Sequence, residues 1–95
     1  IVFDSAKEAR RYRELKLLER AGVISDLQLQ PEFILSVAFT KNGKRYRAIK
    51  YIADFQYTEN GQTVIEDVKG VKTAVYRLKK TLFEAQYPDL TITEV

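Results

Sequence analysis

Two Asn-Gly dipeptides constrain the fold of this chain more than any other feature. Asn42-Gly43 lies between β-prone runs at 32–40 and 46–57, and Asn60-Gly61 separates the second run from another at 63–69. Asn-Gly between apolar, β-prone residues is a strong hairpin signal, because both residues accept the positive φ angles of a type I′ turn. The sequence therefore predicts an antiparallel meander in the middle of the chain.

A helix is predicted before the meander. Ser5 fits the N-cap of a helix from Ala6 to about Ala21, Glu8 follows at the capping-box position, and Gly22 is placed to end the helix. The expected inner stripe of this helix is Ala9, Tyr12, Leu15, Leu18 and Ala21. A short strand is expected within 23–30, before Pro31.

A second helix is predicted after the meander, from Lys72 to about Ala85, and Pro88 prevents its continuation. Its expected inner side is formed by Val71, Val75, Leu78, Leu82 and Ala85. A last strand within 90–95 could lie parallel to a neighbour. The predicted order is α-β-β-β-β-α-β, an α+β class with a mixed or antiparallel sheet, in one domain spanning residues 1–95.

The amino-acid composition excludes several kinds of chemistry. The 95 residues contain no cysteine and no histidine, so thiolate zinc sites, histidine-ligated metals and Ser-His-Asp or Cys-His catalysis are all ruled out. Any metal must be held by oxygen atoms, which suits Mg²⁺, Mn²⁺ or Ca²⁺. No apolar run approaches the length of a membrane span, and we expect a cytoplasmic protein without membrane partners.

The net charge of +3 is consistent with a polyanionic partner such as DNA. Most of the positive residues form three groups in the sequence, and solvated helix and strand faces are the alternative explanation for each. The groups are Arg10, Arg11, Arg13, Lys16 and Arg20; Lys41, Lys44, Arg45, Arg47 and Lys50; and Lys72, Arg77, Lys79 and Lys80.

Two aspartates on neighbouring runs are the chemically most informative residues. Strand alternation places Asp67 on the same face as Ile65 and Lys69, and Asp54 on the face of Ile52 and Gln56, opposite Tyr51, Ala53 and Phe55. With a suitable register, Asp54 and Asp67 meet. Two carboxylates about 4 Å apart repel by about 1 kcal/mol in water and about 4 kcal/mol at an effective dielectric constant of 20, which a divalent cation would offset. Solvent-facing residues of a half-exposed sheet are the alternative.

These residues resemble the PD-(D/E)XK nuclease superfamily, in which an aspartate is followed on the next strand by (Asp/Glu)-X-Lys. Here Asp54 is followed by Asp67-Val68-Lys69, and a glutamate on the first helix, Glu8, precedes them. Ala53 stands where many members have proline. A closer resemblance is to a family of small, uncharacterised phage and prophage proteins. It is carried by Phe3-Asp4-Ser5-Ala6-Lys7-Glu8-Ala9, Tyr12, Leu15, Gln30-Pro31, Ala53-Asp54-Phe55 and Glu66-Asp67-Val68-Lys69-Gly70.

The resemblance implies a restriction-endonuclease-like fold and a Mg²⁺- or Mn²⁺-dependent DNA endonuclease, dimeric and acting on branched or junction DNA. Its catalytic residues would be Glu8, Asp54, Asp67 and Lys69, with the metal on Asp54, Asp67 and Glu8. Glu8 could instead serve only the capping box. Glu66, on the opposite face from Asp67, and Gln30 are supporting candidates. The candidate DNA contacts are Lys72, Thr73, Lys79 and Lys80, close to or along the second helix.

A non-catalytic double-stranded nucleic-acid-binding module is the alternative function. Double-stranded RNA-binding domains also run helix, three-stranded meander, helix, with lysines opening the last helix. The acids Asp54, Glu66 and Asp67 argue against that alternative, because without a metal they would repel phosphate.

Overall fold

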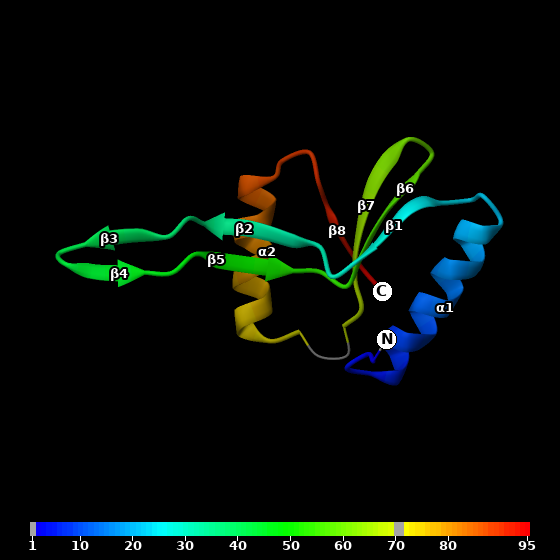
Figure 1. Ribbon diagram of the computed structural model, residues 1–95, viewed down its shortest axis with the longest axis horizontal. Coiled ribbons are helices and arrows are strands. Elements are labelled where there is room, and N and C mark those ends of the chain that lie inside the picture. The colour runs from blue at the N-terminus through cyan, green and yellow to red at the C-terminus, as the bar shows by residue number, and fades with distance from the viewer. Residues whose placement is uncertain (1, 70–71) are drawn as a thin grey trace.

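The computed structural model describes residues 2–69 and 72–95 and has the α+β class predicted for it. Its central sheet contains four strands in the order β1-β6-β7-β8 (Figure 1). These strands are β1 (Ser25–Leu29), β6 (Phe55–Glu59), β7 (Gln62–Asp67) and β8 (Ile92–Glu94). The first three strands are antiparallel neighbours, and β8 joins β7 in parallel, so the sheet is mixed.

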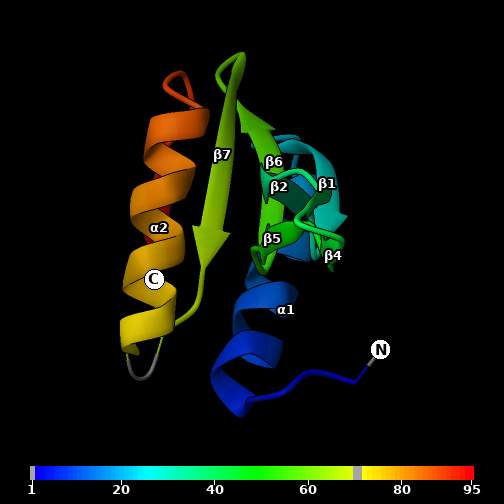
Figure 2. The ribbon, with the colours of Figure 1, turned by 90° about the vertical axis from the view of Figure 1, so that its left-hand side faces the viewer.

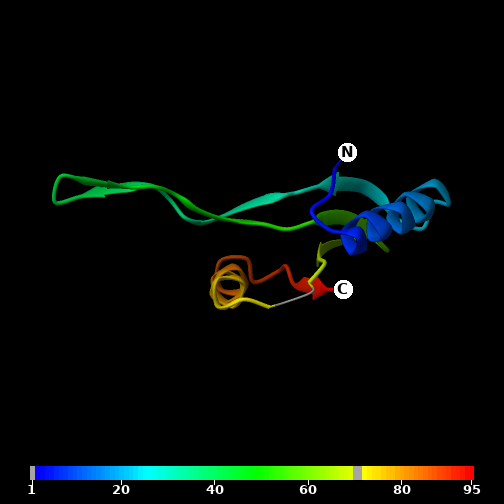
Figure 3. The same cartoon turned by 90° about the horizontal axis from the view of Figure 1, so that it is seen from below.

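Two helices lie on different sides of this sheet (Figures 2 and 3). Helix α1 (Ala6–Arg20) covers a cluster that contains Leu15, Ile24, Phe55 and Tyr57. Helix α2 (Ala74–Gln86) covers the other cluster, which contains Leu35, Tyr51, Ala53, Ile65, Tyr76, Phe83 and Ile92. Because β7 is covered on both sides, the consecutive residues Ile65, Glu66 and Asp67 are all buried, although their side chains point to alternate faces of the sheet.

The start of α1 agrees with the prediction from its sequence. Ser5 is the N-cap and accepts a hydrogen bond from the Glu8 N–H at 3.1 Å, while Gly22, with a φ of 79°, follows the helix end. Leu15 is fully buried in the expected stripe, although Ala21 is exposed. The residues at its two ends therefore suffice to locate this helix without reference to tertiary packing.

Between β1 and β6 the chain forms a long two-stranded extension, here called the arm (residues 32–52). Its inner part pairs β2 (Glu32–Ser36) with β5 (Ile49–Ile52), and its outer part pairs β3 (Phe39–Lys41) with β4 (Lys44–Tyr46). The arm projects to the left of Figure 1, and Figure 3 shows it from a second direction. The molecule is consequently elongated, measuring 54 × 29 × 21 Å.

Both predicted Asn-Gly turns are present. Asn42 and Gly43 have φ angles of 52° and 73°, and Asn60 and Gly61 have φ angles of 52° and 76°. Positive φ at both central residues is the geometry of a type I′ hairpin. These two turns connect β3 to β4 and β6 to β7.

The predicted uninterrupted strands at 32–40 and 46–57 were wrong. The first is divided between β2 and β3, and the second between β4, β5 and β6. The chain bends at Asp54, where it passes from the arm into the central sheet. Consequently Ala53 belongs to the cluster under α2 and Phe55 to the cluster under α1. The prediction that these two residues share a face was therefore wrong.

The predicted inner face of α2 was also wrong. Val75, Leu78 and Leu82 are exposed, whereas Tyr76 and Phe83 are buried. Burying large aromatic rings removes more apolar surface from water than burying the smaller aliphatic side chains, so the aromatic positions set the helix rotation. Val71 lies outside the described residues. In the described ranges, no helix combines the length and apolar character needed to cross a membrane.

Candidate active site

The register of β6 and β7 places Asp54 opposite Asp67. Phe55 pairs with Glu66, and the Asp54 N–H donates to the Glu66 carbonyl oxygen at 3.1 Å. The Asp54 carboxylate then accepts a hydrogen bond from the Val68 N–H at 2.7 Å. This aspartate is therefore fixed through both its backbone and its side chain to the strand that carries Asp67.

Asp67 is buried, with an exposed fraction of 1%. The Tyr51 hydroxyl donates a hydrogen bond to its Oδ2 atom, and the Lys69 ammonium lies 2.9 Å from its Oδ1 atom. The Lys69 contact is an ion pair without the angles of a hydrogen bond, so Oδ1 has no hydrogen-bond partner among the described residues. A buried carboxylate oxygen in that state can still accept a ligand.

The two aspartates hold their protons more tightly than usual. Burial is the main cause of the raised pKa of Asp67, and the nearby Asp54 carboxylate raises it further, against the lowering effect of Lys69 and Tyr51. Burial is also the main cause of the raised pKa of Asp54, against the Val68 N–H, and the Glu8 carboxyl group raises it further. The low dielectric and the like charges thus disfavour full ionisation of the pair.

Glu8 joins these acids from α1. It is 8% exposed, and its carboxyl group lies within hydrogen-bonding reach of Asp54. The Glu8 N–H provides the cap contact with Ser5, whereas its side chain interacts with Asp54. Capping and participation in the acidic row are thus compatible for this residue.

Lys69 borders both the acids and a cleft. Its ammonium group lies 4.3 Å from the centre of the Tyr76 ring, a cation–π contact that fixes the side chain against α2. The cleft has a volume of about 260 Å³. It is lined by Lys50, Tyr51, Ile52, Lys69, Thr73, Val75, Tyr76 and Lys79.

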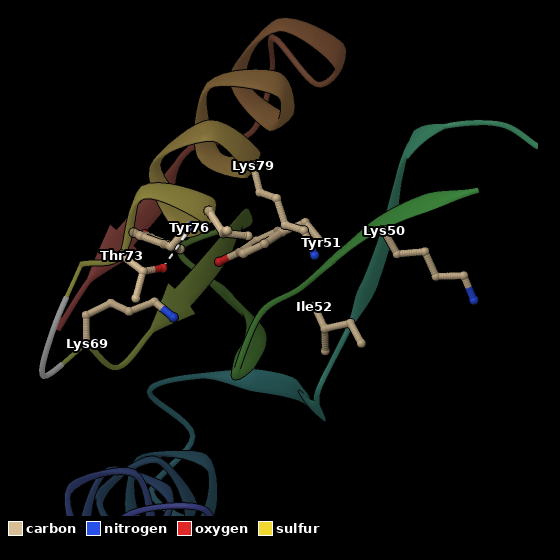
Figure 4. Close-up of a pocket in the computed structure, with 8 residues that line it drawn as sticks. Lys50, Tyr51, Ile52, Lys69, Thr73, Tyr76 and Lys79 are labelled. Carbon is tan, nitrogen blue, oxygen red and sulfur yellow. Dashed lines mark hydrogen bonds between the residues drawn. The ribbon is translucent and has the colours of Figure 1, made fainter. Parts of the chain in front are cut away.

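Two of the three lysines direct their ammonium groups toward this cleft. Figure 4 shows the ammonium groups of Lys69 and Lys79 near opposite ends of the Tyr51 side chain, while Lys50 points away. Lys50 instead pairs with Glu32 across the arm at 3.0 Å. The cleft is therefore a cationic recess that opens beside a buried carboxylate.

Glu66 lies on the opposite face from Asp67, as predicted. It is 1% exposed and accepts two hydrogen bonds from Arg11, at 2.8 and 2.7 Å, together with one from the Tyr57 hydroxyl. These bonds raise the pKa of Arg11, against the opposing effect of burial. Glu66 therefore fixes α1 to β7 and does not reach the acids of the site.

The predicted DNA contacts on α2 are only partly available. Lys72 and Lys80 lie 3.1 and 3.6 Å from the carboxylate of Glu94, which also accepts a hydrogen bond from Tyr76. These contacts lower the pKa of Glu94 to about 2. Of the predicted set, Thr73 and Lys79 line the cleft, and the Thr73 hydroxyl additionally caps α2 by accepting from the Tyr76 N–H.

Gln30 is a structural residue in this arrangement. Its side chain is exposed, its φ is 51°, and its N–H donates to the Asp54 carbonyl oxygen at 3.0 Å. It therefore holds the backbone at the bend. Gly70, which ends the motif that carries the resemblance, lies outside the described residues.

Sequence reasoning missed Tyr51, Tyr76 and Arg11, which position Asp67, Lys69 and Glu66 respectively. The contacts of Tyr51 and Arg11 join residues 16 and 55 positions apart in the sequence, and the contact of Tyr76 with Lys69 depends on how α2 packs beside β7, so no local spacing could reveal them. The one available signal was chemical, since a buried tyrosine needs a partner for its hydroxyl group.

The acids form a row from Glu8 through Asp54 to Asp67. Within residues 2–69 and 72–95, no three acidic side chains converge as a complete set of metal ligands. A cation at this site would therefore be held by two carboxylates at most, with the remaining ligands supplied by water or substrate.

Comparison with known proteins gave two findings. Residues 1–95 match the family described as "Protein of unknown function (DUF1064)", and the chain belongs to this family. No match was found among curated proteins. The family description states no activity or ligand.

Proposed function

We propose that this protein is a Mg²⁺- or Mn²⁺-dependent DNA endonuclease that hydrolyses phosphodiester bonds, with branched or junction DNA as a candidate substrate. One observation carries the proposal. Asp54 and Asp67 lie side by side, and Lys69 contacts the Asp67 oxygen that has no hydrogen-bond partner among the described residues. Burying like charges is costly unless a cation is bound, so this arrangement favours a cation-dependent role.

Two carboxylates suit Mg²⁺ better than they suit a metal that needs all of its ligands from the protein. Mg²⁺ keeps several water molecules and is usually held by one or two carboxylates together with substrate phosphate oxygens. Asp67 and Asp54 would be those ligands, with Glu8 behind Asp54. When bound, the ion would supply Lewis-acid stabilisation of charge on the phosphodiester.

The other residues have roles that follow from their contacts. The Lys69 ammonium would stabilise charge on the phosphate or assist deprotonation of water. Tyr51 is a positioning residue, because its hydroxyl donates to Asp67 Oδ2 while the Lys69 ammonium lies beside Oδ1, so the carboxylate is held between the two side chains. Lys79, across the cleft, would hold a neighbouring phosphate.

We also propose that the fold is restriction-endonuclease-like. Without the arm, the described elements run α1, β1, β6, β7, α2 and β8, with three antiparallel strands followed by a crossover helix and a parallel strand. The acids lie on β7 and at the entrance to β6, next to the lysine that follows β7. This arrangement supports the fold expected from the sequence resemblance.

The non-catalytic module is less well supported. It requires lysines at the start of the last helix to be available for phosphate, whereas Lys72 is paired with Glu94. It also gives no reason for burying Asp67 beside Asp54, at an electrostatic cost.

Cleavage of supercoiled and four-way-junction DNA in Mg²⁺, Mn²⁺ or EDTA tests the proposal. Wild-type protein should nick DNA only with a divalent ion. Asp67→Asn and Lys69→Met should each lower the rate by about 100-fold or more, because several kcal/mol of transition-state stabilisation is removed. Retained cleavage in EDTA, or in Asp67→Asn, would overturn the proposal.

Matched variants separate chemistry from general charge effects. Asp26→Asn removes an exposed acid at a positive φ that asparagine tolerates, and Lys16→Met removes an exposed lysine on α1. Both should cleave at the wild-type rate. Thermal melting adds an independent readout, since Mn²⁺ should raise the Tm of wild-type protein but not that of Asp67→Asn.

A further inference from the structure

The arm carries a charge imbalance that the rest of the chain lacks. From 33 to 53 there is no aspartate or glutamate, and Glu32 at the base is paired with Lys50. Beyond that pair, the exposed cations of the arm are Lys41, Lys44, Arg45 and Arg47. None of these four has an acidic partner among the described residues, and the chain outside the arm has 11 cations against 12 acids.

Packing within the protein does not account for the outer part of the arm, residues 37–46, which are all exposed, whereas Leu35 and Tyr51 of the inner part are buried under α2. The radius of gyration is 15.3 Å, whereas a compact chain of this length would have about 12 Å. Apolar side chains on the arm remain in solvent, including Val37 at 70% and Phe39 at 45% exposed. An exposed, cationic and partly apolar ribbon is typical of a surface that contacts a ligand.

Register places the cations on both faces of the ribbon. Phe39 pairs with Tyr46 and Lys41 with Lys44, so these pairs share one face, and the two rings stack with centroids 4.7 Å apart. Arg45 pairs with Thr40 and points to the other face. A ribbon with cations on both faces can contact phosphates on both walls of a groove.

We propose that the arm is a DNA-binding element that enters the major groove of duplex DNA with its Asn42-Gly43 tip leading. The major groove is about 12 Å wide and admits a two-stranded ribbon. The strands of the outer hairpin, three residues each, span about 10 Å, which is close to the groove depth of about 8.5 Å. The stacked rings would contact sugars and thymine methyl groups.

The position of the arm agrees with this role. Lys50, Tyr51 and Ile52 of β5 line the cleft beside Asp67, so the base of the arm borders the candidate active site. The inference deepens the proposed function and rests on it for DNA as the ligand. Binding without cleavage can be measured separately, because it needs the arm and not the acids.

Fluorescence anisotropy with a 30-base-pair DNA duplex in EDTA tests the inference on the full chain. Lys41→Gln/Lys44→Gln and Arg45→Gln/Arg47→Gln should each weaken binding by about 10- to 100-fold at 0.1 M salt and reduce the salt slope by about 2. The matched control, Arg10→Gln/Arg13→Gln, removes the same charge from the exposed face of α1 and should change affinity less than about threefold. Equal losses in control and arm variants would overturn the inference.

Two further comparisons test the assigned ligand. An RNA duplex should bind at least about tenfold more weakly than the DNA duplex, because its major groove is too narrow and deep for a ribbon. Equal, arm-dependent binding of RNA would overturn the assignment to DNA. Sedimentation should give wild type and arm variants the same mass; a dimer lost in the arm variants, with DNA affinity unchanged, would assign the arm to a second copy of the chain.

The two proposals fail in different ways. Asp67→Asn should bind DNA like wild type but not cleave it, whereas the arm variants should cleave slowly at low DNA concentration because they bind weakly. Circular dichroism and thermal melting establish that each variant is folded. Normal DNA affinity in folded arm variants would overturn the arm proposal and leave the endonuclease proposal standing.

Discussion

The central sheet and the arm are both built from antiparallel pairing, yet they place their polar residues in opposite ways. The sheet buries acids, since Glu66 and Asp67 are each 1% exposed between two helices. The arm has exposed cations and only Glu32 as an acid. Strand pairing alone therefore does not determine the role of a charged side chain. That role depends on whether the face of the sheet or arm is covered by a helix or exposed to solvent.

The largest expected difference between the regions is in packing. Phe55→Ala should lower the free energy of unfolding by about 3–5 kcal/mol, because the ring is fully buried in the sheet. Phe39→Ala on the arm should cost less than about 1 kcal/mol, since the ring is partly in solvent. Urea denaturation measures both values. Similar costs at the two positions would contradict the distinction between a packed sheet and an exposed arm.

Breaking the Arg11–Glu66 pair should have the next largest effect. Arg11→Met leaves a buried carboxylate without its cation and should cost about 3 kcal/mol. Adding Glu66→Gln should recover part of this loss, because the amide has no charge to be buried and can still accept from Tyr57. Urea denaturation of the two single variants and the double variant gives the double-mutant cycle that measures the interaction between the two side chains. A double variant less stable than Arg11→Met would contradict the account.

The raised pKa values predict a pH dependence specific to the sheet. Because native Asp67 binds its proton more tightly than the unfolded chain does, its contribution to stability is present below the ordinary pKa of 3.8 and lost as pH rises. Asp67→Asn should therefore gain stability relative to wild type between pH 3.5 and 7, as measured by urea denaturation at each pH. A constant difference would contradict the burial argument.

Glu94 provides a control of opposite sign. Its pKa is lowered to about 2, so its contribution is present above the ordinary value of 4.5 and lost as pH falls. Glu94→Gln should accordingly lose stability relative to wild type as pH rises toward neutrality.

The smallest expected effect is at the arm tip. Gly43→Ala places a β-carbon at a φ of 73° and should cost about 1 kcal/mol of local stability, because alanine is strained there although it meets no neighbouring atom. Amide exchange should accelerate in β3 and β4 and remain unchanged in β6 and β7. Uniform acceleration would mean that the arm and the sheet unfold together.

Local signals predicted the parts of the fold that have local causes. The cap at Ser5 and the turns at Asn42-Gly43 and Asn60-Gly61 depend on residues near one another in sequence, and they were predicted correctly. The same holds for the opposite faces of Glu66 and Asp67, which follow from strand alternation within β7. The roles of the acids in catalysis remain predictions.

Features decided by tertiary contacts were not predictable in the same way. The bend at Asp54 arises where the chain changes from one sheet to another, and no residue there breaks a strand by itself. The rotation of α2 depends on the aromatic rings of Phe33 and Tyr51, which contact Phe83 from the arm. The pairing of Lys72 with Glu94 requires β8 to lie beside β7.

The bend at Asp54 has a mechanical consequence. Only Ala53 separates Ile52, the last residue of β5, from this aspartate, and both strands of the ribbon are tied at this point by the bonds from Gln30 to Asp54 and from Ala53 to Pro31. The base of the ribbon is thus anchored at the acid itself. A displacement of the distant tip that reached this anchor would move the Asp54 backbone, and with it the carboxylate of the candidate site.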